Sequence, residues 1–219
     1  MKMRRIYIMA AVLCILGIAR ANAASLLYTF DTSAAGADGG AFNAGNYAWS
    51  SAYQAVQATD TAGGWTMGSG GGPQFEFGWP SQSTVQTIAT AGDGRVSFDL
   101  FVDANSFVGT WADGDWYQLH FAGNSNGGGW TQDAGGSNPV DTNYHPGTGG
   151  NWHFDESFAQ MGWTTSATWF QLEFGANSAS GHSVQFYIDN IQVYEVPEPA
   201  TCALIGLGTA GLLIFRRRS

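Results

Sequence analysis

Aromatic and polar side chains alternate in two short segments of this chain. Residues 116–120 carry an indole, an amide and an imidazole at every second position, and residues 169–173 carry an indole, an amide and a carboxylate with the same spacing. Alternate residues of a strand share one face of a sheet. An indole offers a flat apolar platform for a sugar ring, and the polar groups can bond to its hydroxyls. This spacing predicts a carbohydrate-binding sheet face.

A third segment, residues 95–102, adds a carboxylate to this face if the three strands are neighbours. The predicted binding residues are Trp116, Gln118, His120, Trp169, Gln171, Glu173 and Asp99. The alternative is that both tryptophans are half-buried sheet residues covered by loops, because sheet faces often carry aromatic side chains without a binding role.

Apolar side chains occupy the positions between these polar ones, and they predict the core between two sheets. They are Val96, Phe98, Leu100, Val102, Tyr117, Leu119, Phe121, Phe170, Leu172 and Phe174. No sustained helical period precedes the C-terminal tail, and short alternating runs are separated by Gly, Asn, Asp and Ser. This pattern favours an all-β sandwich.

The expected strands, with three weaker candidates last, are Leu26–Phe30, Gln74–Phe77, Arg95–Val102, Trp116–Ala122, Thr168–Phe174, Val184–Tyr194, Tyr47–Val56, Ser83–Ala89 and Asn151–Phe154. Gly68–Gly72 is expected to be a turn or a flexible loop, and Gly123–Gly150 a long polar loop of the kind that is often functional or mobile.

Catalytic signatures are sparse. The histidines follow no metal-binding spacing, and no nucleophile elbow is present. Two carboxylate pairs could serve a glycosidase, but Asp113 and Asp115 are better explained by a hairpin turn, and Asp155 and Glu156 by a loop. The sequence therefore predicts a protein that is not an enzyme, with a polysaccharide-degrading enzyme as the remaining alternative.

Charge excludes one class of partner. Between the two processing sites the only basic residue is Arg95, against seventeen acidic ones if Glu198 is kept, which gives a net charge of −16 where the whole chain has −9. Such a surface repels phosphate backbones and anionic lipid, so nucleic acid is excluded as a partner, and it favours divalent cations. Cys14 and Cys202 lie in the two ends, so the central domain has no disulfide.

The N-terminus has the three parts of a secretory signal peptide. A basic start is followed by the apolar run Ile6–Ile18 and by the small residues Ala21 and Ala23, which predict cleavage by signal peptidase after Ala23. The alternative, an N-terminal membrane anchor, normally needs a longer apolar run of roughly 18 residues or more.

The C-terminus has three parts in order. The short motif is Pro197, Glu198 and Pro199, the apolar stretch runs from Ala200 to Phe215, and the basic cluster is Arg216, Arg217 and Arg218. An apolar helix followed by arginines is typical of a stop-transfer segment. This order resembles the PEP-CTERM sorting signal. The resemblance implies recognition by an exosortase, a membrane-embedded cysteine protease-transpeptidase, and a transient transmembrane helix. An ordinary C-terminal anchor is the alternative.

A second resemblance concerns the fold. The segments 27–31, 96–100 and 186–194 are similar to strands of the galactose-binding-like jelly roll found in many carbohydrate-binding modules. In that family a structural Ca²⁺ often joins the first strand to the last, and the resemblance assigns its side-chain ligands to Asp31 and Asp189. The alternative is that these aspartates cap a turn and a bulge.

Together these features predict a signal peptide over residues 1–23, a jelly-roll β-sandwich over 24–196 and a sorting signal over 197–219. The expected protein is exported, held briefly in the membrane and then placed at the cell surface or in the extracellular matrix. Its expected role is non-catalytic binding of extracellular polysaccharide; a structural matrix protein without a defined ligand is the alternative.

Overall fold

The structure is a computed structural model. It describes residues 25–36, 39–44, 46–59, 72–132, 143–145, 147, 149–179 and 182–196. The compact unit Ser25–Glu195 contains every strand discussed below. The predicted signal peptide and the Pro197–Arg218 sorting signal lie outside the described residues. Within the described part of the chain, no helix has the length and hydropathy needed to cross a membrane.

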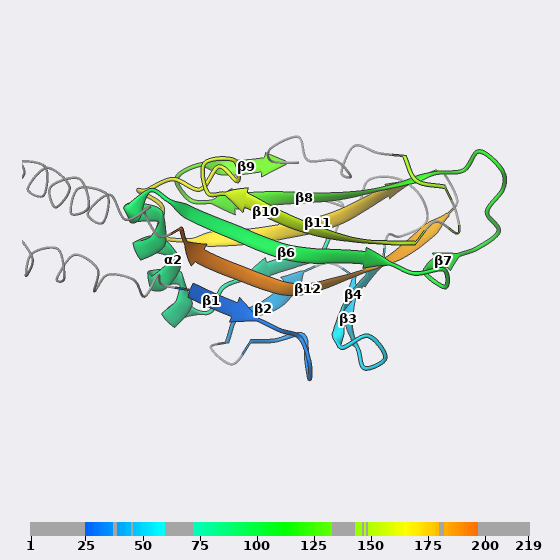
Figure 1. The fold of residues 1–219 in the computed structure, drawn as a ribbon, viewed down its shortest axis with the longest axis horizontal. Coiled ribbons are helices and arrows are strands. Elements are labelled where there is room, and N and C mark those ends of the chain that lie inside the picture. Colours follow the sequence, from blue (N-terminus) through cyan, green and yellow to red (C-terminus); the bar gives the residue numbers. More distant parts are fainter. Residues whose placement is uncertain are drawn as a thin grey trace, which may run out of the picture. The chain divides into compact units, whose positions relative to one another are not determined.

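Two antiparallel sheets pack face to face (Figure 1). Sheet A contains β1 (Ser25–Tyr28), β3 (Tyr47–Ser50), β4 (Ala55–Thr59), β6 (Gly94–Val102), β7 (Phe107–Val108), β10 (Gly150–Ser157) and β12 (Ser183–Glu195). Sheet B has the order β2 (Ala41–Ala44), β5 (Gln74–Glu76), β11 (Phe170–Ser178), β8 (Tyr117–Ser125) and β9 (Gly129–Gln132). The chain passes repeatedly from one sheet to the other, as expected for the predicted jelly-roll sandwich.

The core lies between the sheets and is rich in phenylalanine. Phe98 of β6 contacts Phe121 of β8 and Phe174 of β11, with ring centroids 5.0 and 5.1 Å apart. All the predicted inward-facing residues of these three strands are buried. The alternation in the sequence therefore identified the core face of each strand correctly.

One helix, α2 (Trp79–Ala91), lies at an end of the sandwich and packs against β1, β6 and β12 (Figure 1). The prediction of a strand at Ser83–Ala89, and of no helix in this domain, is therefore wrong. Pro80 fits the first helical turn, where its missing N–H is not needed, and Gly92 ends the helix in the left-handed conformation with φ 92°. The buried face of the helix includes Val85 and Ile88.

Two expected loops also contain strands. Asp155 and Glu156 lie in β10, where β6 pairs with them, and not in a loop. The expected loop at 123–150 contains the end of β8 and all of β9. The turn predicted at Asp113–Asp115 is present, with Gly114 at φ 99°.

A β-bulge resets the inward face of β12. Val184, Phe186 and Ile188 are buried, and the buried positions then continue at Ile191 and Val193. The pairing with β6 shifts between Asp189 and Gln192, and Asn190 adopts a φ of 52°. A bulge therefore lies next to Asp189, where the alternative interpretation of this residue placed one.

The first and last strands of the domain are neighbours. β1 pairs with β12 in the register Ser25↔Tyr194 to Tyr28↔Ile191. The points at which the chain enters and leaves the sandwich are therefore adjacent, at the same end of sheet A.

Candidate functional site

The outer face of sheet B brings together most of the predicted binding residues. β8 and β11 are paired, so Gln118 and His120 lie beside the strand that carries Gln171 and Glu173. Because the inward face of each strand is buried in the core, these four side chains share the opposite face. His120, Gln171 and Glu173 are nevertheless only 3–5% exposed, so neighbouring groups cover most of their surface.

Asp99 does not belong to this group. It lies on β6 in sheet A, and the outer faces of two stacked sheets point in opposite directions. Its carboxylate accepts hydrogen bonds from His153 Nδ1 at 2.7 Å and Asn190 Nδ2 at 2.8 Å. The alternation assigned Asp99 to an outer face correctly but could not show which sheet holds its strand.

Trp116 and Trp169 lie at opposite ends of the β8–β11 pair. The Trp116 carbonyl accepts a hydrogen bond from Ala179 N, and the Trp169 carbonyl accepts one from Asn126 N. Asn126 is the residue opposite Trp169, and Trp116 precedes it by ten residues. At the usual rise of a strand, ten residues span about 30 Å. The two indoles cannot contact the same short oligosaccharide, which corrects the prediction of a single site containing both.

Two tryptophans near one end of the face are each hydrogen-bonded to a carboxylate. Trp169 Nε1 donates to Glu76 Oε1 at 2.9 Å, and Trp130 Nε1 donates to Glu173 Oε2 at 3.2 Å. Trp130 lies on β9, opposite Asn124 of β8, and Glu76 lies on β5, opposite Gln171 of β11. The two pairs therefore occupy adjacent positions across four strands of the sheet.

Amide side chains connect these two pairs. Asn124 Nδ2 donates to Gln171 Oε1 at 3.4 Å, and Gln171 Nε2 donates to Gln74 Oε1 at 3.2 Å. We call the resulting set the sheet-B row. It consists of Trp130, Asn124, Gln171, Glu173, Gln74, Glu76 and Trp169.

Sequence reasoning missed four members of the row. Gln74 and Glu76 flank the buried Phe75, and Trp130 alternates with Gln132, so the same spacing rule applies to both segments. β5 was expected as a strand, but its three residues give too few alternations to assign its polar side chains to a binding face. Asn124 and the four-residue β9 fell within the loop expected at 123–150.

Hydrogen bonds fix the indoles before any ligand arrives. A carboxylate that accepts an indole N–H restrains the rotation of the ring and leaves its flat face to be used for stacking. Trp130 remains 44% exposed. The row thus combines apolar ring surface with amide and carboxylate groups, which is the chemistry needed to bind a sugar.

A pocket of about 210 Å³ opens beside the row, next to the start of α2. Its lining residues are Gly39, Ala41, Glu76, Phe77, Gly78, Trp79 and Gln82. Trp79, at 86% exposed, is the most exposed of the large hydrophobic side chains in the described part of the chain. Glu76 belongs to both the pocket and the row, so the two are continuous.

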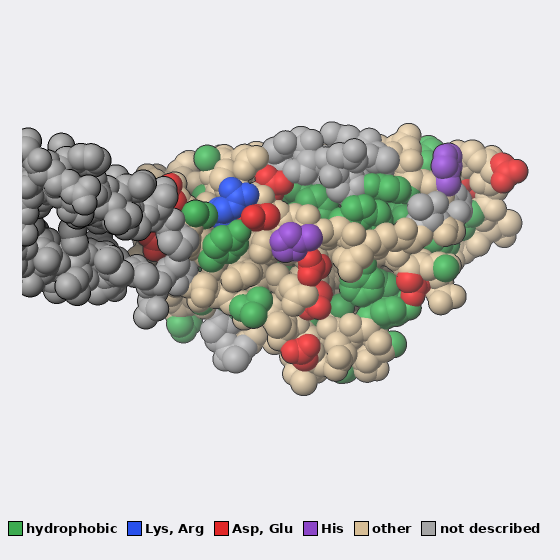
Figure 2. Space-filling view, in the orientation of Figure 1, with side chains coloured by type: hydrophobic (Ala, Val, Ile, Leu, Met, Phe, Trp, Pro, Cys, Tyr) green, Lys and Arg blue, Asp and Glu red, His purple; other side chains and the backbone are tan. Residues whose placement is uncertain are grey.

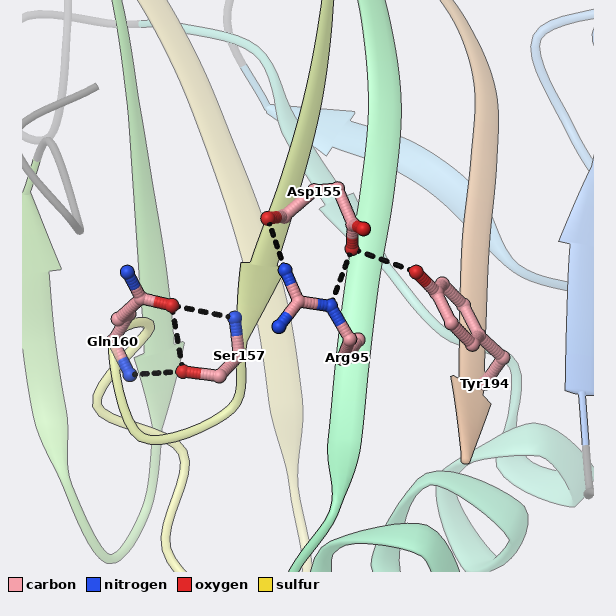
Figure 3. A network of polar contacts seen from close by, with 5 residues as sticks. All are labelled: Arg95, Asp155, Ser157, Gln160 and Tyr194. Atoms are coloured by element: carbon pink, nitrogen blue, oxygen red, sulfur yellow. Dashed lines mark hydrogen bonds and ion pairs between the residues drawn. The ribbon is translucent and has the colours of Figure 1, made fainter. Parts of the chain in front are cut away.

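The outer face of sheet A has a different character. Figure 2 shows acidic and histidine side chains along this face, among hydrophobic patches. Arg95 Nε donates to Asp155 Oδ1 at 2.8 Å, Arg95 also donates to the Asp155 carbonyl, and Tyr194 donates to the same carboxylate (Figure 3). The hydrogen bond that Arg95 donates to the Asp155 carboxylate raises the pKa of Arg95. The one basic side chain of the domain is therefore engaged on the sheet opposite the row.

Asp31 and Asp189 lie near each other, as expected for a tie between the first and last strands. Asp189 Oδ1 accepts a hydrogen bond from Phe30 N at 3.3 Å. Burial raises the pKa of Asp189, and the negative charges of Asp31 and Asp99 contribute in the same direction. Within the described residues, however, no three acidic, histidine or cysteine side chains form a group that could hold a metal ion. The two aspartates thus supply only part of the ligand set that Ca²⁺ requires.

The final strand leads directly into the segment that identifies the C-terminus. Residues 195–218 match the family described as the PEP-CTERM protein-sorting motif. The chain carries a PEP-CTERM sorting motif. The matched PEP-CTERM residues begin at Glu195, the last residue of β12, so only Val196 separates the folded strand from Pro197.

Comparison of the fold with solved structures gives distant similarities. The xylan-binding CBM22-1 domain of Paenibacillus barcinonensis Xyn10C is 13% identical, with a TM-score of 0.39 over 80% of this chain and 95% of that domain. CBM27-1 of Caldicellulosiruptor saccharolyticus, solved with mannohexaose, is 14% identical, with a TM-score of 0.41 over 77% and 95%. No curated protein matches the sequence.

Proposed function

We propose that this protein is a non-catalytic polysaccharide-binding domain that uses the sheet-B row to bind a neutral glycan. The observation that supports the proposal is the pair of indoles, Trp130 and Trp169, each hydrogen-bonded to a carboxylate on the outer face of sheet B. Sugar rings stack on such platforms, and their hydroxyls exchange hydrogen bonds with the amides and carboxylates between them.

The negative charges of the sheet-B row favour a neutral glycan over an acidic one. The row contains Glu76 and Glu173, and Arg95 is bonded to Asp155 on the other sheet. An acidic polysaccharide would bring carboxylates toward carboxylates without a cation to pair them, which is unfavourable at close range. A neutral polymer does not incur this repulsion.

Binding can be tested by calorimetry with xylo- and manno-oligosaccharides of two to six residues, followed by an array of other neutral glycans. Trp130→Ala and Trp169→Ala should each weaken binding by about fivefold, the equivalent of roughly 1 kcal/mol for a lost ring contact. Trp116→Ala is the matched control, because it removes an indole from the same face about 30 Å away.

Three results would contradict the proposal. If wild-type protein binds none of the glycans, the alternative of a structural matrix protein is favoured. If Trp116→Ala weakens binding as much as Trp169→Ala, the row is not the site. Release of reducing sugar from any polysaccharide would favour the enzymatic alternative.

Export and sorting complete the proposal. The PEP-CTERM motif supports secretion and processing by an exosortase. We expect signal peptidase to remove residues 1–23 and the C-terminal segment to hold the chain in the membrane until the exosortase cuts it. The domain would then act at the cell surface or in the surrounding polysaccharide.

We also propose a structural Ca²⁺ at Asp31 and Asp189. Its support is electrostatic, since burial and the charges of Asp31 and Asp99 disfavour ionised Asp189. A divalent cation would relieve that repulsion. Backbone carbonyls and water would have to complete its coordination, because two aspartates are too few for this ion.

A further inference from the structure

Trp79 and the pocket beside it have no role in the fold that accounts for their exposure. A tryptophan is one of the largest apolar side chains, and most are largely buried. Trp79 is 86% exposed at the first position of α2, at the edge of a pocket that Glu76 also lines. Leaving such a ring in water is unfavourable, and an exposed apolar group beside a polar pocket is typical of a binding site.

Gln82 holds the start of α2, which carries Trp79, against the strand of Trp169. Its Nε2 donates to the carbonyls of Phe77 and Phe170 at 3.2 and 3.0 Å, and its Oε1 accepts from Phe170 N at 2.9 Å. Phe170 follows Trp169 directly, so the first turn of α2 is bonded to the strand that carries the nearer indole of the row. This buried amide fixes the start of the helix that carries Trp79 before a ligand binds.

We propose that Trp79 and this pocket form a terminal subsite that receives one sugar of a glycan bound across the sheet-B row. The proposal rests on the proposed function and extends it to ligand length. The row crosses β9, β8, β11 and β5, three strand spacings or about 14 Å, before it reaches the pocket. A short oligosaccharide bound at Trp130 ends before the subsite, and a longer chain reaches it.

Carboxylate chemistry favours a sugar over a lipid surface as the occupant. Glu76 lines the pocket, and the domain has a large net negative charge. An anionic membrane would repel both, whereas sugar hydroxyls donate hydrogen bonds to a carboxylate. The pocket also joins the row through Glu76, which accepts the Trp169 indole N–H, so one ligand can occupy both.

The experiment compares affinity with ligand length. The probes are the xylo- or manno-oligosaccharides that wild-type protein binds, from disaccharide to hexasaccharide, and the variants are Trp79→Ala, Trp79→Phe and Trp130→Ala. We expect Trp79→Ala to bind the shortest ligands like wild type and the hexasaccharide about fivefold more weakly. Trp79→Phe should recover most of the hexasaccharide affinity, and Trp130→Ala should lose affinity at every length.

The possible results separate this inference from the proposed function. The subsite is overturned if Trp79→Ala binds the hexasaccharide like wild type, or if it loses the same affinity for ligands of every length. In either case Trp130→Ala still tests the row. A second assay measures binding to phosphatidylglycerol vesicles. If wild type binds them and Trp79→Ala does not, while hexasaccharide binding by Trp79→Ala stays normal, the subsite is overturned in favour of a membrane contact. A wild-type protein that binds no oligosaccharide would overturn both proposals. Unfolding midpoints should match wild type in both Trp79 variants, because the side chain is exposed.

Discussion

The turn that leads to Trp130 offers a sensitive test of how the site is positioned. Gly128 lies between β8 and β9, and its N–H donates to Ser125 Oγ at 3.0 Å. The same hydroxyl donates to the Gly162 carbonyl at 3.3 Å. A Cβ added at Gly128 would lie 1.5 Å from the Gly162 carbonyl oxygen, where ordinary contacts begin at 3.4 Å. The Cβ is attached to the backbone of Gly128 and the oxygen belongs to the backbone of Gly162, so no side-chain rotation can relieve the collision. The turn and the segment around Gly162 must move apart.

The Gly128→Ala variant should therefore lose stability and affinity together. Overpacking of this kind costs about 1–3 kcal/mol, which corresponds to a decrease in unfolding midpoint of about 2–12 °C for a domain of this size. Trp130 is two residues further along, so the displaced turn should move its indole away from Glu173. We expect glycan affinity to fall by about fivefold or more, as for Trp130→Ala.

Gly114→Ala is the matched control. Gly114 has φ 99°, and an added Cβ would meet no atom within 4 Å, so the change introduces backbone strain without a collision. That strain costs about 1–2 kcal/mol, at a turn outside the row. Scanning calorimetry and titration calorimetry on the same samples would distinguish the two effects. If Gly128→Ala melts and binds like wild type, or if both variants lose equal affinity, the argument that the turn positions Trp130 is wrong.

Further predictions concern Asp189, calcium and processing. Burial raises the pKa of Asp189 above its ordinary 3.8, so its stabilising contribution is present below that value and is lost as the pH rises through the folded pKa. In chelator, Asp189→Asn should thus raise the unfolding midpoint at pH 7 and match wild type below about pH 4; a lower midpoint at pH 7 would contradict the assignment. If Ca²⁺ binds, millimolar calcium should raise the unfolding midpoint of wild type and leave that of Asp189→Asn unchanged. At a hundredfold excess over Kd, the gain in the free energy of unfolding is about 2.7 kcal/mol. An unchanged midpoint in wild type would mean that Asp31 and Asp189 are only turn and bulge residues. Mass spectrometry of released protein should show a start near Ala24 and loss of Arg216–Arg218, and recovery of released protein with Arg218 intact would disprove processing.

The sequence was sufficient to predict the strands that form the core. Three long strands alternate apolar and polar residues, and the apolar positions, such as Phe98, Phe121 and Phe174, are all buried. Alternation reports which face of a strand is buried, because one face must be apolar. The same rule failed for α2, where Ser83–Ala89 was expected as a weaker strand. The stronger local signals were Pro80 in the first turn and Gly92 at the end.

The composition of the site could be predicted in part, but its geometry could not. Alternation does not show which strands are neighbours, so Asp99 was grouped with strands of the other sheet. It also does not show strand direction, and antiparallel pairing sends Trp116 and Trp169 to opposite ends. Trp79 and Trp130 lie at the start of a helix and on a short strand, where no period marks them. Long-range strand pairing, which depends on the whole chain, decides the positions of Asp99, Trp116, Trp169 and Trp130.

The pairing of β12 within sheet A has a mechanical consequence. β12 has thirteen residues and pairs with β6, β4, β1 and β7, and the chain leaves the domain at its end. A pull on the C-terminal side acts along this strand. Because the hydrogen bonds of an antiparallel sheet lie perpendicular to the strands, such a force loads many bonds in shear at once and does not open them one by one. A domain tethered by its C-terminal side should therefore resist extraction of its last strand when a bound polymer is dragged by flow.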